Sequence, residues 1–337
     1  MAGEGGKVHI GISGWRYTPW RGVFYPRGLP QRKELAFASR MLPTLELNGS
    51  FYSLQSPASY QAWHDETPDD FVFAVKGPRY LTHMLRLKEA RVPLANFFAS
   101  GVLALRHKLG PILWQFPATM PFDAERFDAF FDLLPRTTEA AAALAREHDQ
   151  RLDHRDWLGP VPRRPLRHAV EIRHESFRDP RFIALLRRHK VALVVADTAG
   201  RWPLIEDVTS DFVYLRLHGD KELYASGYDA EALDQWAARI DAWRHGGQLA
   251  GSRTAASTRP PRRASREVFC YFDNDVKVHA PFDAAALARR LGVATGLRDD
   301  GQFEPPPGLA GPRSRSPAFG KSARKPAREG AAKSERA

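Results

Sequence analysis

Ionisable side chains alternate with apolar ones in several strand-like segments, and their types suit anion binding and proton transfer. The pattern is clearest in 168–174 and 211–219, where the residues of one parity are aliphatic. Residues of the other parity lie on the opposite face of a strand, and here they are Glu171, Arg173, Tyr214, Arg216 and His218. Because burying an unpaired charge is costly, such a face either pairs its charges internally or lines a ligand site.

The segments that position these residues alternate between strand and helix patterns. The expected strands are 8–13, 44–49, 71–76, 111–116, 168–173, 191–197, 212–218 and 267–273. The expected helices are 31–42, 57–66, 94–109, 123–148, 179–189, 229–243 and 283–291, with Asp123 and Asp179 as N-caps and Asp283 at the start of the last helix.

This alternation predicts an α/β fold, a TIM-type (β/α) barrel of seven to eight strands. A doubly wound open sheet is the alternative, but no GxGxxG or GxxxxGK[ST] motif follows the first strand. We expect one domain over 1–298, because the segment beyond it has the composition of a disordered tail.

In such barrels the functional site lies at the C-terminal ends of the strands, and nearly every expected strand here ends in a polar residue. Those strand-end residues are Asn48, Lys76, Gln115, Arg173, Asp197, His218 and, after the eighth strand, Asp273, Asn274 and Asp275, with Tyr52 just beyond the second strand. Glu46 lies deeper in its strand than the others, so we expect it to form structural pairs.

The first hypothesis is an enzyme acting on a small phosphorylated or carboxylated substrate. Lys76, Arg173 and Arg216 would hold the anion. Glu171 or Asp197 would be the general base and His218 the general acid. The other substrate-binding candidates are Asn48, Tyr52, Gln115, Tyr214 and Asn274. The residues leave the reaction class open among a hydrolase, a lyase and an isomerase.

No cofactor is identified from the sequence. Glu171, Asp197, His218 and Asp275 have the chemistry of divalent-metal ligands, but no HExxH or comparable spacing supports a metal site. The single cysteine, Cys270, excludes an intramolecular disulfide framework and a multi-cysteine zinc site. A Ser-His-Asp hydrolase is disfavoured because no GxSxG motif is present.

Two basic segments account for the whole net charge of +11. Residues 244–266 contain six arginines and no acid, and we expect a flexible basic insertion there. Residues 301–337 carry a net charge of +5 and belong to an expected disordered basic tail over 299–337. The pI therefore says little about the folded surface, although both segments have the chemistry to contact nucleic-acid phosphates.

Two alternatives to the enzyme hypothesis remain open. The first is a nucleic-acid-binding or abasic-site-processing protein, whose barrel mouth accepts a flipped nucleotide with help from 244–266 and 301–337. The second is a non-catalytic barrel whose interior charges form a structural ion-pair lattice. The oligomeric state is not indicated by the sequence.

The start of the chain has no apolar signal-peptide run. No stretch approaches the ~18 apolar residues of a membrane-spanning helix. We therefore expect a soluble cytoplasmic protein with no membrane partner.

Several short motifs in a fixed order carry a resemblance to a known family. They lie at 10–15 (Ile-Gly-Ile-Ser-Gly-Trp), 25–26, 46–52, 73–76, 113–117, 169–177, 214–219 and 271–275. At these positions the chain resembles the YecE-like family, an uncharacterised TIM-barrel family catalogued as domain of unknown function seventy-two. The resemblance runs from about 8 to 292 and implies a barrel but no reaction. At fold level it is similar to barrels of the sugar isomerase and endonuclease IV group, an analogy of fold alone.

Overall fold

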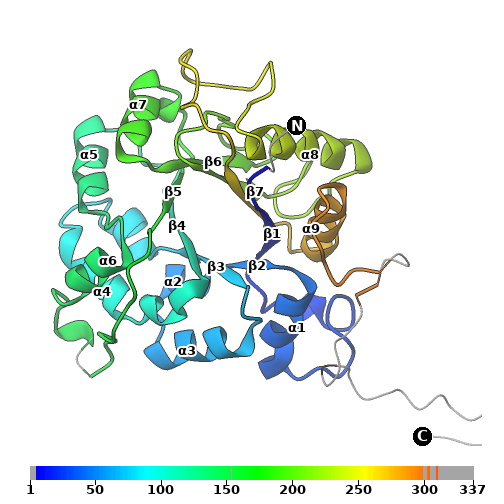
Figure 1. The fold of residues 1–337 in the computed structure, drawn as a ribbon, viewed down its shortest axis with the longest axis horizontal. Helices are drawn as coiled ribbons and strands as arrows, with labels where there is room; N and C mark the ends of the chain where they lie inside the picture. The colour runs from blue at the N-terminus through cyan, green and yellow to red at the C-terminus, as the bar shows by residue number, and fades with distance from the viewer. Residues whose placement is uncertain (1–4, 153, 299–301, 304–308, 310–337) are drawn as a thin grey trace, which may run out of the picture.

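The computed structural model describes residues 5–152, 154–298, 302, 303 and 309. Its centre is a closed barrel of eight parallel strands that pair in chain order (Figure 1). The strands are β1 (Val8–Ser13), β2 (Thr44–Leu47), β3 (Val72–Lys76), β4 (Leu109–Gln115), β5 (His168–Glu171), β6 (Ala192–Asp197), β7 (Phe212–Leu217) and β8 (Glu267–Phe272). The closed barrel confirms the predicted fold class, with eight strands, and rules out the open sheet.

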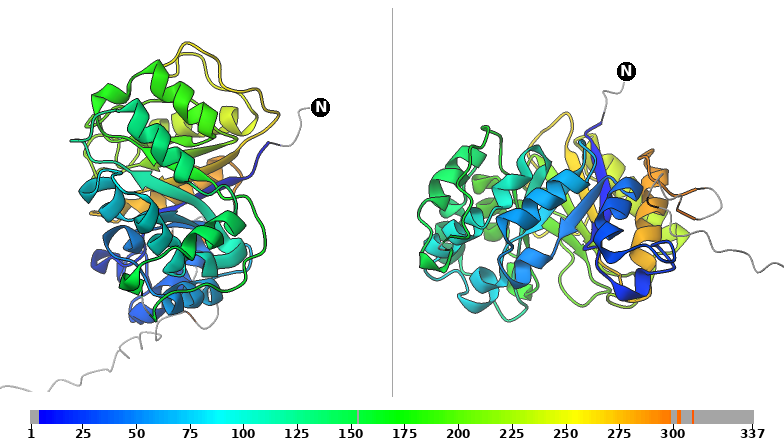
Figure 2. Two further views of the ribbon diagram at one scale, coloured as in Figure 1. Left: turned by 90° about the vertical axis from the view of Figure 1, so that its left-hand side faces the viewer. Right: turned by 90° about the horizontal axis from the view of Figure 1, so that it is seen from below.

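Helices surround this barrel on the outside, as two side views also show (Figure 2). They are α1 (Glu34–Met41), α2 (Gly49–Tyr52), α3 (Pro57–Glu66), α4 (Arg91–Ala99), α5 (Ala124–Leu133), α6 (Thr138–Ala145), α7 (Pro180–His189), α8 (Ala230–Arg244) and α9 (His279–Arg290). A π-helical turn, Tyr80–Met84, follows β3. Short 3₁₀ turns occupy Thr18–Trp20, Gln31–Lys33, Val102–Lys108, Gln150–Leu152 and Glu175–Phe177.

Two of the predicted helix starts are confirmed and one is wrong. Asp123 and Asp179 accept hydrogen bonds from backbone N–H groups in the first turns of α5 and α7. Asp283 does not begin the last helix, because α9 starts at His279. The Asp283 carboxylate instead accepts bonds from the Tyr228 N–H and the Asn274 amide, so it serves a tertiary contact.

The predicted helix over 123–148 is also wrong in its continuity. It forms two helices, α5 and α6, with Pro135 between them. Proline has no N–H to donate and its ring clashes with the preceding turn, which explains the break. The short helix α2 lies where the sequence predicted the end of strand 44–49.

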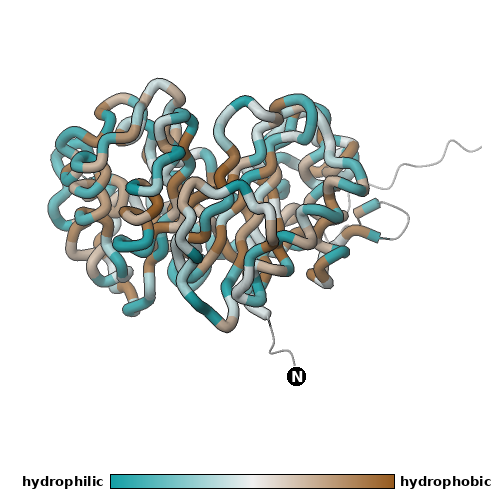
Figure 3. The backbone as a smooth tube through the Cα atoms, turned by 90° about the horizontal axis from the view of Figure 1, so that it is seen from above, coloured by the Kyte–Doolittle hydropathy of each residue, from teal (hydrophilic) through white to brown (hydrophobic). Residues whose placement is uncertain are grey.

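The barrel interior is filled by small residues from some strands and aromatic residues from others. The apolar cluster within it consists of Ala74, Leu113, Ala169, Ala192, Val194, Ala196, Phe212, Tyr214, Phe269 and Tyr271. Alanines on β3, β5 and β6 leave room for the rings of β7 and β8, so the lower layers pack without a pore. Hydrophobic segments accordingly gather toward the middle of the molecule and hydrophilic ones over the outer loops (Figure 3).

The basic insertion 244–266 covers a gap in the ring of helices. No helix connects β6 to β7 in the described chain, and the insertion runs between α7 and α8, in yellow in Figure 1. The buried Glu206 accepts a bond from the Arg253 N–H at 2.7 Å, and the buried Asp207 accepts one from the Ala255 N–H at 2.6 Å. Ala256 is buried beside them. The flexibility of the insertion stays a prediction, but its middle is anchored.

Two further expectations concern the C-terminal tail and membrane-spanning segments. The predicted tail over 299–337 lies, apart from residues 302, 303 and 309, outside the described residues. Among the helices that are described, none is long and apolar enough to cross a bilayer.

Replacing Asp207 by alanine should loosen the insertion without unfolding the barrel. The change leaves the N–H groups of Ala255 and Ala256 unpaired near the core, at a cost of about 1–3 kcal/mol. Limited trypsin digestion should therefore cut at the arginines of 253–263 faster than in the wild type. The exposed Glu89→Gln variant is the control, and an unchanged cleavage rate in the Asp207 variant would refute the anchoring.

Candidate functional site

A buried arginine on β7 lies among three carboxylates near the C-terminal end of the barrel. Arg216 is 1% exposed. Its guanidinium donates to Glu46 at 2.8 and 3.1 Å, to Glu171 at 2.7 Å and to Asp273 at 2.7 Å. The three carboxylates keep the pKa of Arg216 well above its usual value even though burial lowers it. The residues come from β2, β5, β7 and the end of β8, so the guanidinium ties distant parts of the barrel together.

The Glu46 carboxylate is fully hydrogen-bonded. Besides Arg216, it accepts bonds from the Tyr214 hydroxyl at 2.6 Å and from the Ser13 hydroxyl at 2.6 Å. Ser13 Oγ in turn accepts a bond from the Asn48 amide at 2.8 Å. Glu46 therefore forms the structural pairs that its register indicates, and it takes no part in lining a cavity.

Glu171 is shared between two arginines. Its second oxygen accepts a bond from Arg173 Nε at 2.9 Å, and the Arg173 guanidinium stacks 3.8 Å from the ring centroid of Trp202. Burial raises the pKa of Glu171, but the charges of Arg216 and Arg173 outweigh it and hold the pKa well below its usual range. Glu171 is thus an ionised group with both oxygens occupied.

Above this network lies a cavity of about 670 Å³ at the barrel mouth. It is lined by Tyr17, Asn48, Phe51, Tyr52, Lys76, Arg79, His83, Met84, Gln115, Arg173, Tyr224, Asp273 and Asp275. The walls therefore carry several cations, and the carboxyl groups of Asp273 and Asp275 lie on the β8 side. A cavity at the C-terminal ends of the strands is where barrels of this kind hold ligands.

Lys76 is a buried cation without a counter-ion. It is 7% exposed at the end of β3, and its Nζ lies 4.2 Å from the ring centroid of Phe51. Within the described part of the chain, Nζ makes no hydrogen bond and has no carboxylate within 4.0 Å. Burial, with the charge of Arg216, lowers the pKa of Lys76 to about 8. The amine is therefore partly neutral near physiological pH.

Two neighbouring carboxyl groups after β8 have opposite proton affinities. Arg216 and His218 lower the pKa of Asp273 below its usual range despite burial. Burial, together with the negative charge of Asp273, raises the pKa of Asp275 well above its usual value. Two carboxyl groups so close together cannot both ionise easily, so their pKa values are pushed apart and Asp275 is the one that keeps its proton to higher pH. Pairs whose pKa values are pushed apart in this way are typical of acid–base sites.

His218 supports Asp273 from beneath the cavity. The ring is fully buried, with Nδ1 3.0 Å from an Asp273 oxygen and Nε2 3.4 Å from the Arg216 guanidinium. Because the guanidinium can only donate, Nε2 is the nitrogen that accepts, and Nδ1 is the nitrogen that faces Asp273. His218 does not line the cavity, so it acts on the acid pair through Asp273.

Comparison with known proteins identifies the family. The family model described as "Protein of unknown function DUF72" matches residues 9–307. The chain belongs to the DUF72 family. This confirms the resemblance seen in the short motifs.

Two curated UPF0759 proteins match different lengths of this chain. The chain is 27% identical to the UPF0759 protein YecE of Escherichia coli O157:H7 over 217 residues, which is 60% of this chain and 75% of YecE. It is 30% identical to the UPF0759 protein YunF of Bacillus subtilis (strain 168) over 115 residues, which is 33% of this chain and only 40% of YunF.

Two crystal structures of DUF72 family proteins share the fold. The protein from Thermotoga maritima MSB8 gives a TM-score of 0.64 at 24% identity, covering 85% of this chain and 99% of the other. One from Enterococcus faecalis V583 gives a TM-score of 0.59 at 16% identity, covering 85% and 96%. At these identities the likeness concerns the fold alone.

The structure of this DUF72 chain sorts the predicted site residues into three groups. The cavity wall includes Asn48, Tyr52, Lys76, Gln115 and Arg173. The buried network beneath it includes Glu171, Tyr214, Arg216 and His218. Asp197 and Asn274 lie elsewhere. Asp197 accepts a bond from the Tyr228 hydroxyl, and Asn274 donates to Asp283 and to a backbone carbonyl.

Several residues that line the cavity were not among the catalytic and substrate-binding candidates from the sequence, although Asp275 was considered as a metal ligand. They are Tyr17, Phe51, Arg79, His83, Met84, Tyr224, Asp273 and Asp275. Asp273 and Asp275 share the interior parity of β8 with Tyr271, so strand alternation was a signal that favoured them over Asn274. Arg79 and His83 lie in the π-helical region after β3, where no simple periodicity fixes the direction of a side chain.

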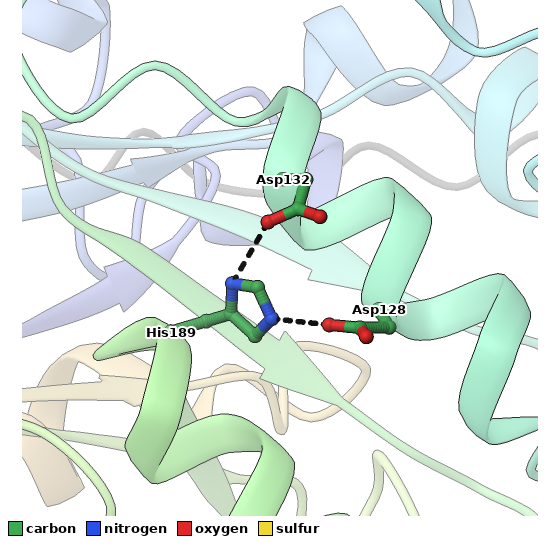
Figure 4. Close-up of side chains that lie close together, drawn as sticks. All are labelled: Asp128, Asp132 and His189. Carbon is green, nitrogen blue, oxygen red and sulfur yellow. Dashed lines mark hydrogen bonds and ion pairs between the residues drawn. The ribbon is translucent and has the colours of Figure 1, made fainter.

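The proposed metal ligands are not gathered into one site. Among the described residues, no group close enough to share an ion is formed by Glu171, Asp197, His218 and Asp275. A different group does have ligand atoms that close together, and it consists of Asp128, Asp132 and His189 (Figure 4). There His189 Nε2 lies 2.5 Å from Asp128 and Nδ1 3.7 Å from Asp132. Arg188 also contacts Asp128. Both ring nitrogens thus face a carboxylate, the arrangement of an ion pair joining α5 to α7.

Removing Arg216 should strongly destabilise the protein. The Arg216→Met variant leaves buried carboxylates unpaired, which costs about 3–5 kcal/mol in the free energy of unfolding. Urea unfolding at pH 7 measures this loss, with Arg181→Met as control because its ion pair with Asp179 is at the surface and should cost less than about 1 kcal/mol.

The same experiment has a pH dependence with a definite sign. In the wild type the pKa values of Glu171 and Asp273 are lower than in the unfolded chain. Their ionised carboxylates therefore add to the free energy of unfolding above the ordinary pKa values of 4.5 and 3.8, and this stabilisation is lost as the pH falls below those values. In the Arg216→Met variant the unpaired carboxylates are relieved of their buried charge when they take up protons. The difference in free energy of unfolding between wild type and variant should therefore become smaller as the pH falls from 7 toward 4. A gap below about 1 kcal/mol at pH 7 would contradict the network's structural role.

Proposed function

We propose that this DUF72 protein is an enzyme that binds a small phosphorylated or carboxylated substrate in the barrel-mouth cavity and transfers protons through Asp273 and Asp275. The observation that carries the proposal is the acid pair itself, which faces a cavity whose other wall is cationic. A purely structural lattice has no need for a protonated carboxyl group beside an open cavity.

The cationic wall supports an anionic ligand. Arg173 lines the cavity and uses Nε on Glu171, and among the described residues its remaining donors make one hydrogen bond, a long one of 3.4 Å to the Tyr224 hydroxyl. Arg79 is exposed and makes no ion pair within the described ranges. Lys76 lacks a counter-ion as well. Guanidinium groups with free donors are the usual partners of phosphate and carboxylate.

Arg216 was expected to hold the substrate anion, but in this proposal it positions carboxylates instead. Its donors are occupied by Glu46, Glu171, Asp273, Ser13 and His218, and it is buried beneath the cavity. It therefore positions and ionises the carboxylates and does not touch the ligand in this proposal. His218 likewise positions Asp273, and the role of general acid passes to the protonated Asp275.

Asn48 supplies a fixed hydrogen-bond acceptor at the edge of the cavity. The Ser13 proton is donated to Glu46, so Ser13 Oγ accepts from Asn48 and fixes the orientation of the amide. The other amide atom, Asn48 Oδ1, has no partner among the described residues. A buried acceptor without a partner is costly, so a hydroxyl or N–H donor on the substrate fits the amide.

Inorganic phosphate is the simplest probe of the cationic wall. Phosphate at about 100 times its dissociation constant should stabilise the wild type by roughly 2.7 kcal/mol, seen as a rise in melting temperature. The Lys76→Met/Arg79→Gln double variant should lose this shift. The matched control is Lys88→Met/Arg86→Gln, which removes two exposed cations from the same region and should keep the shift.

The outcomes separate the three functional hypotheses. An equal phosphate shift in both double variants would contradict the proposed site. Stabilisation by short abasic DNA but not by phosphate would instead favour the nucleic-acid alternative. No shift with phosphate, acetate or DNA, together with a strongly destabilised Arg216 variant, would favour the structural lattice.

A further inference from the structure

We infer that Lys76 is a nucleophile whose amine forms an imine with an aldehyde or ketone that also bears an anionic group. This inference rests on the proposed function, because it assigns the substrate class of the same cavity. It adds a covalent step and a reacting atom, Lys76 Nζ, that anion binding alone does not require.

Comparison of the two buried lysines shows what distinguishes Lys76. Lys108 is also buried, but its Nζ donates to the carbonyls of His64 and Thr67 and to the Thr67 hydroxyl, at 2.6, 2.9 and 3.3 Å. All three of its donors are used, so it is a structural ammonium group. Lys76 Nζ has no such partner in the described chain, and it lines a cavity large enough for a small substrate.

The neighbouring charges leave Lys76 without a counter-ion. The carboxylate of Glu171 is paired with Arg216 and Arg173, and Lys76 Nζ lies over the ring of Phe51. With the pKa lowered from 10.5 to about 8, the neutral fraction at pH 7 is roughly three hundredfold greater than for an ordinary lysine. Desolvation beside other cations is how proteins activate lysine for attack on carbonyl carbon.

The cavity also holds the groups that the step requires. The lone pair of Lys76 Nζ attacks the carbonyl carbon, and the carbonyl oxygen takes a proton from Asp275. The attacking nitrogen then loses a proton to Asp273, which passes it to the hydroxyl oxygen as the carbon–oxygen bond breaks and water leaves. The iminium nitrogen that remains gives its proton back to Asp275, which leaves the neutral imine and restores both carboxyl groups. The net change is amine plus carbonyl giving imine plus water, so no oxidant or reductant is involved. Asp275 and Asp273 line the same cavity as Lys76.

The substrate class follows from the remaining walls. Arg79 and Arg173 provide donors for a phosphate or carboxylate on the same molecule, and Asn48 Oδ1 accepts from a hydroxyl group. A short hydroxylated carbonyl compound with one anionic end satisfies all of these groups at once. A substrate without a carbonyl would leave the neutral amine without a role.

Reductive trapping tests the inference directly. The full chain is incubated with glyceraldehyde 3-phosphate, dihydroxyacetone phosphate or pyruvate in the presence of cyanoborohydride, and adducts are located by peptide mass spectrometry. We expect one adduct, at Lys76, that forms about tenfold or more faster than any adduct at the exposed Lys88. Its rate should rise as the pH increases through about 8.

Two variants make the outcome decisive. Lys76→Arg keeps a positive charge but cannot form an imine, so the major adduct should disappear, whereas Lys88→Arg should label as the wild type does. An adduct that persists in Lys76→Arg, or equal labelling of exposed lysines by all three probes, would overturn the inference. If phosphate still raises the melting temperature while Lys76 stays unlabelled, the imine is refuted and the anion site stands. If neither occurs, both proposals fail.

Discussion

The charge of one buried side chain, Arg216, sets the electrostatics of the whole barrel mouth. A guanidinium is well suited to this position because it stays ionised and offers five donors in a fixed plane. Its ion pairs with Glu46, Glu171 and Asp273 allow three carboxylates to be buried in ionised form. Desolvating so many charges is expensive, and the arrangement is tolerable because each carboxylate oxygen of Glu46 and Glu171 has a donor.

The chemistry of the cavity follows from this network. Arg216 and His218 lower the pKa of Asp273, while burial and the negative charge of Asp273 raise the pKa of Asp275. Burial and the nearby charge of Arg216 lower the pKa of Lys76, whose amine has no carboxylate of the described residues within ion-pair distance. An acid, a partly neutral amine and a cationic wall thus appear together in one cavity. Fold-level likeness to other DUF72 barrels carries no reaction with it, so the functional argument depends on these side chains.

The side-chain alternation of β7, with one aliphatic and one polar parity, predicted the interior position of Arg216. The alternation of strand and helix patterns along the chain predicted the barrel. It gave no such guidance for Asp197, since β6 is apolar on both parities and its last residue has no readable direction. Asp197 in fact lies on the outer parity, bonded to Tyr228. Asn274 was favoured over its neighbour Asp273 by residue type, although parity pointed the other way. Which acceptors occupy the donors of Arg216, and whether a carboxylate pairs with Lys76, depend on the tertiary structure and are not visible in a sequence pattern.

The most direct test of the account is the titration of the two carboxyl groups beside the cavity. Carbon-13 NMR of aspartate side chains, assigned with Asp273→Asn and Asp275→Asn variants, follows each group from pH 3 to 8. The account predicts that Asp273 is ionised throughout and that Asp275 keeps its proton well above 3.8. Titration of both groups near their ordinary values would contradict it, because the network would then not separate an acid from a base.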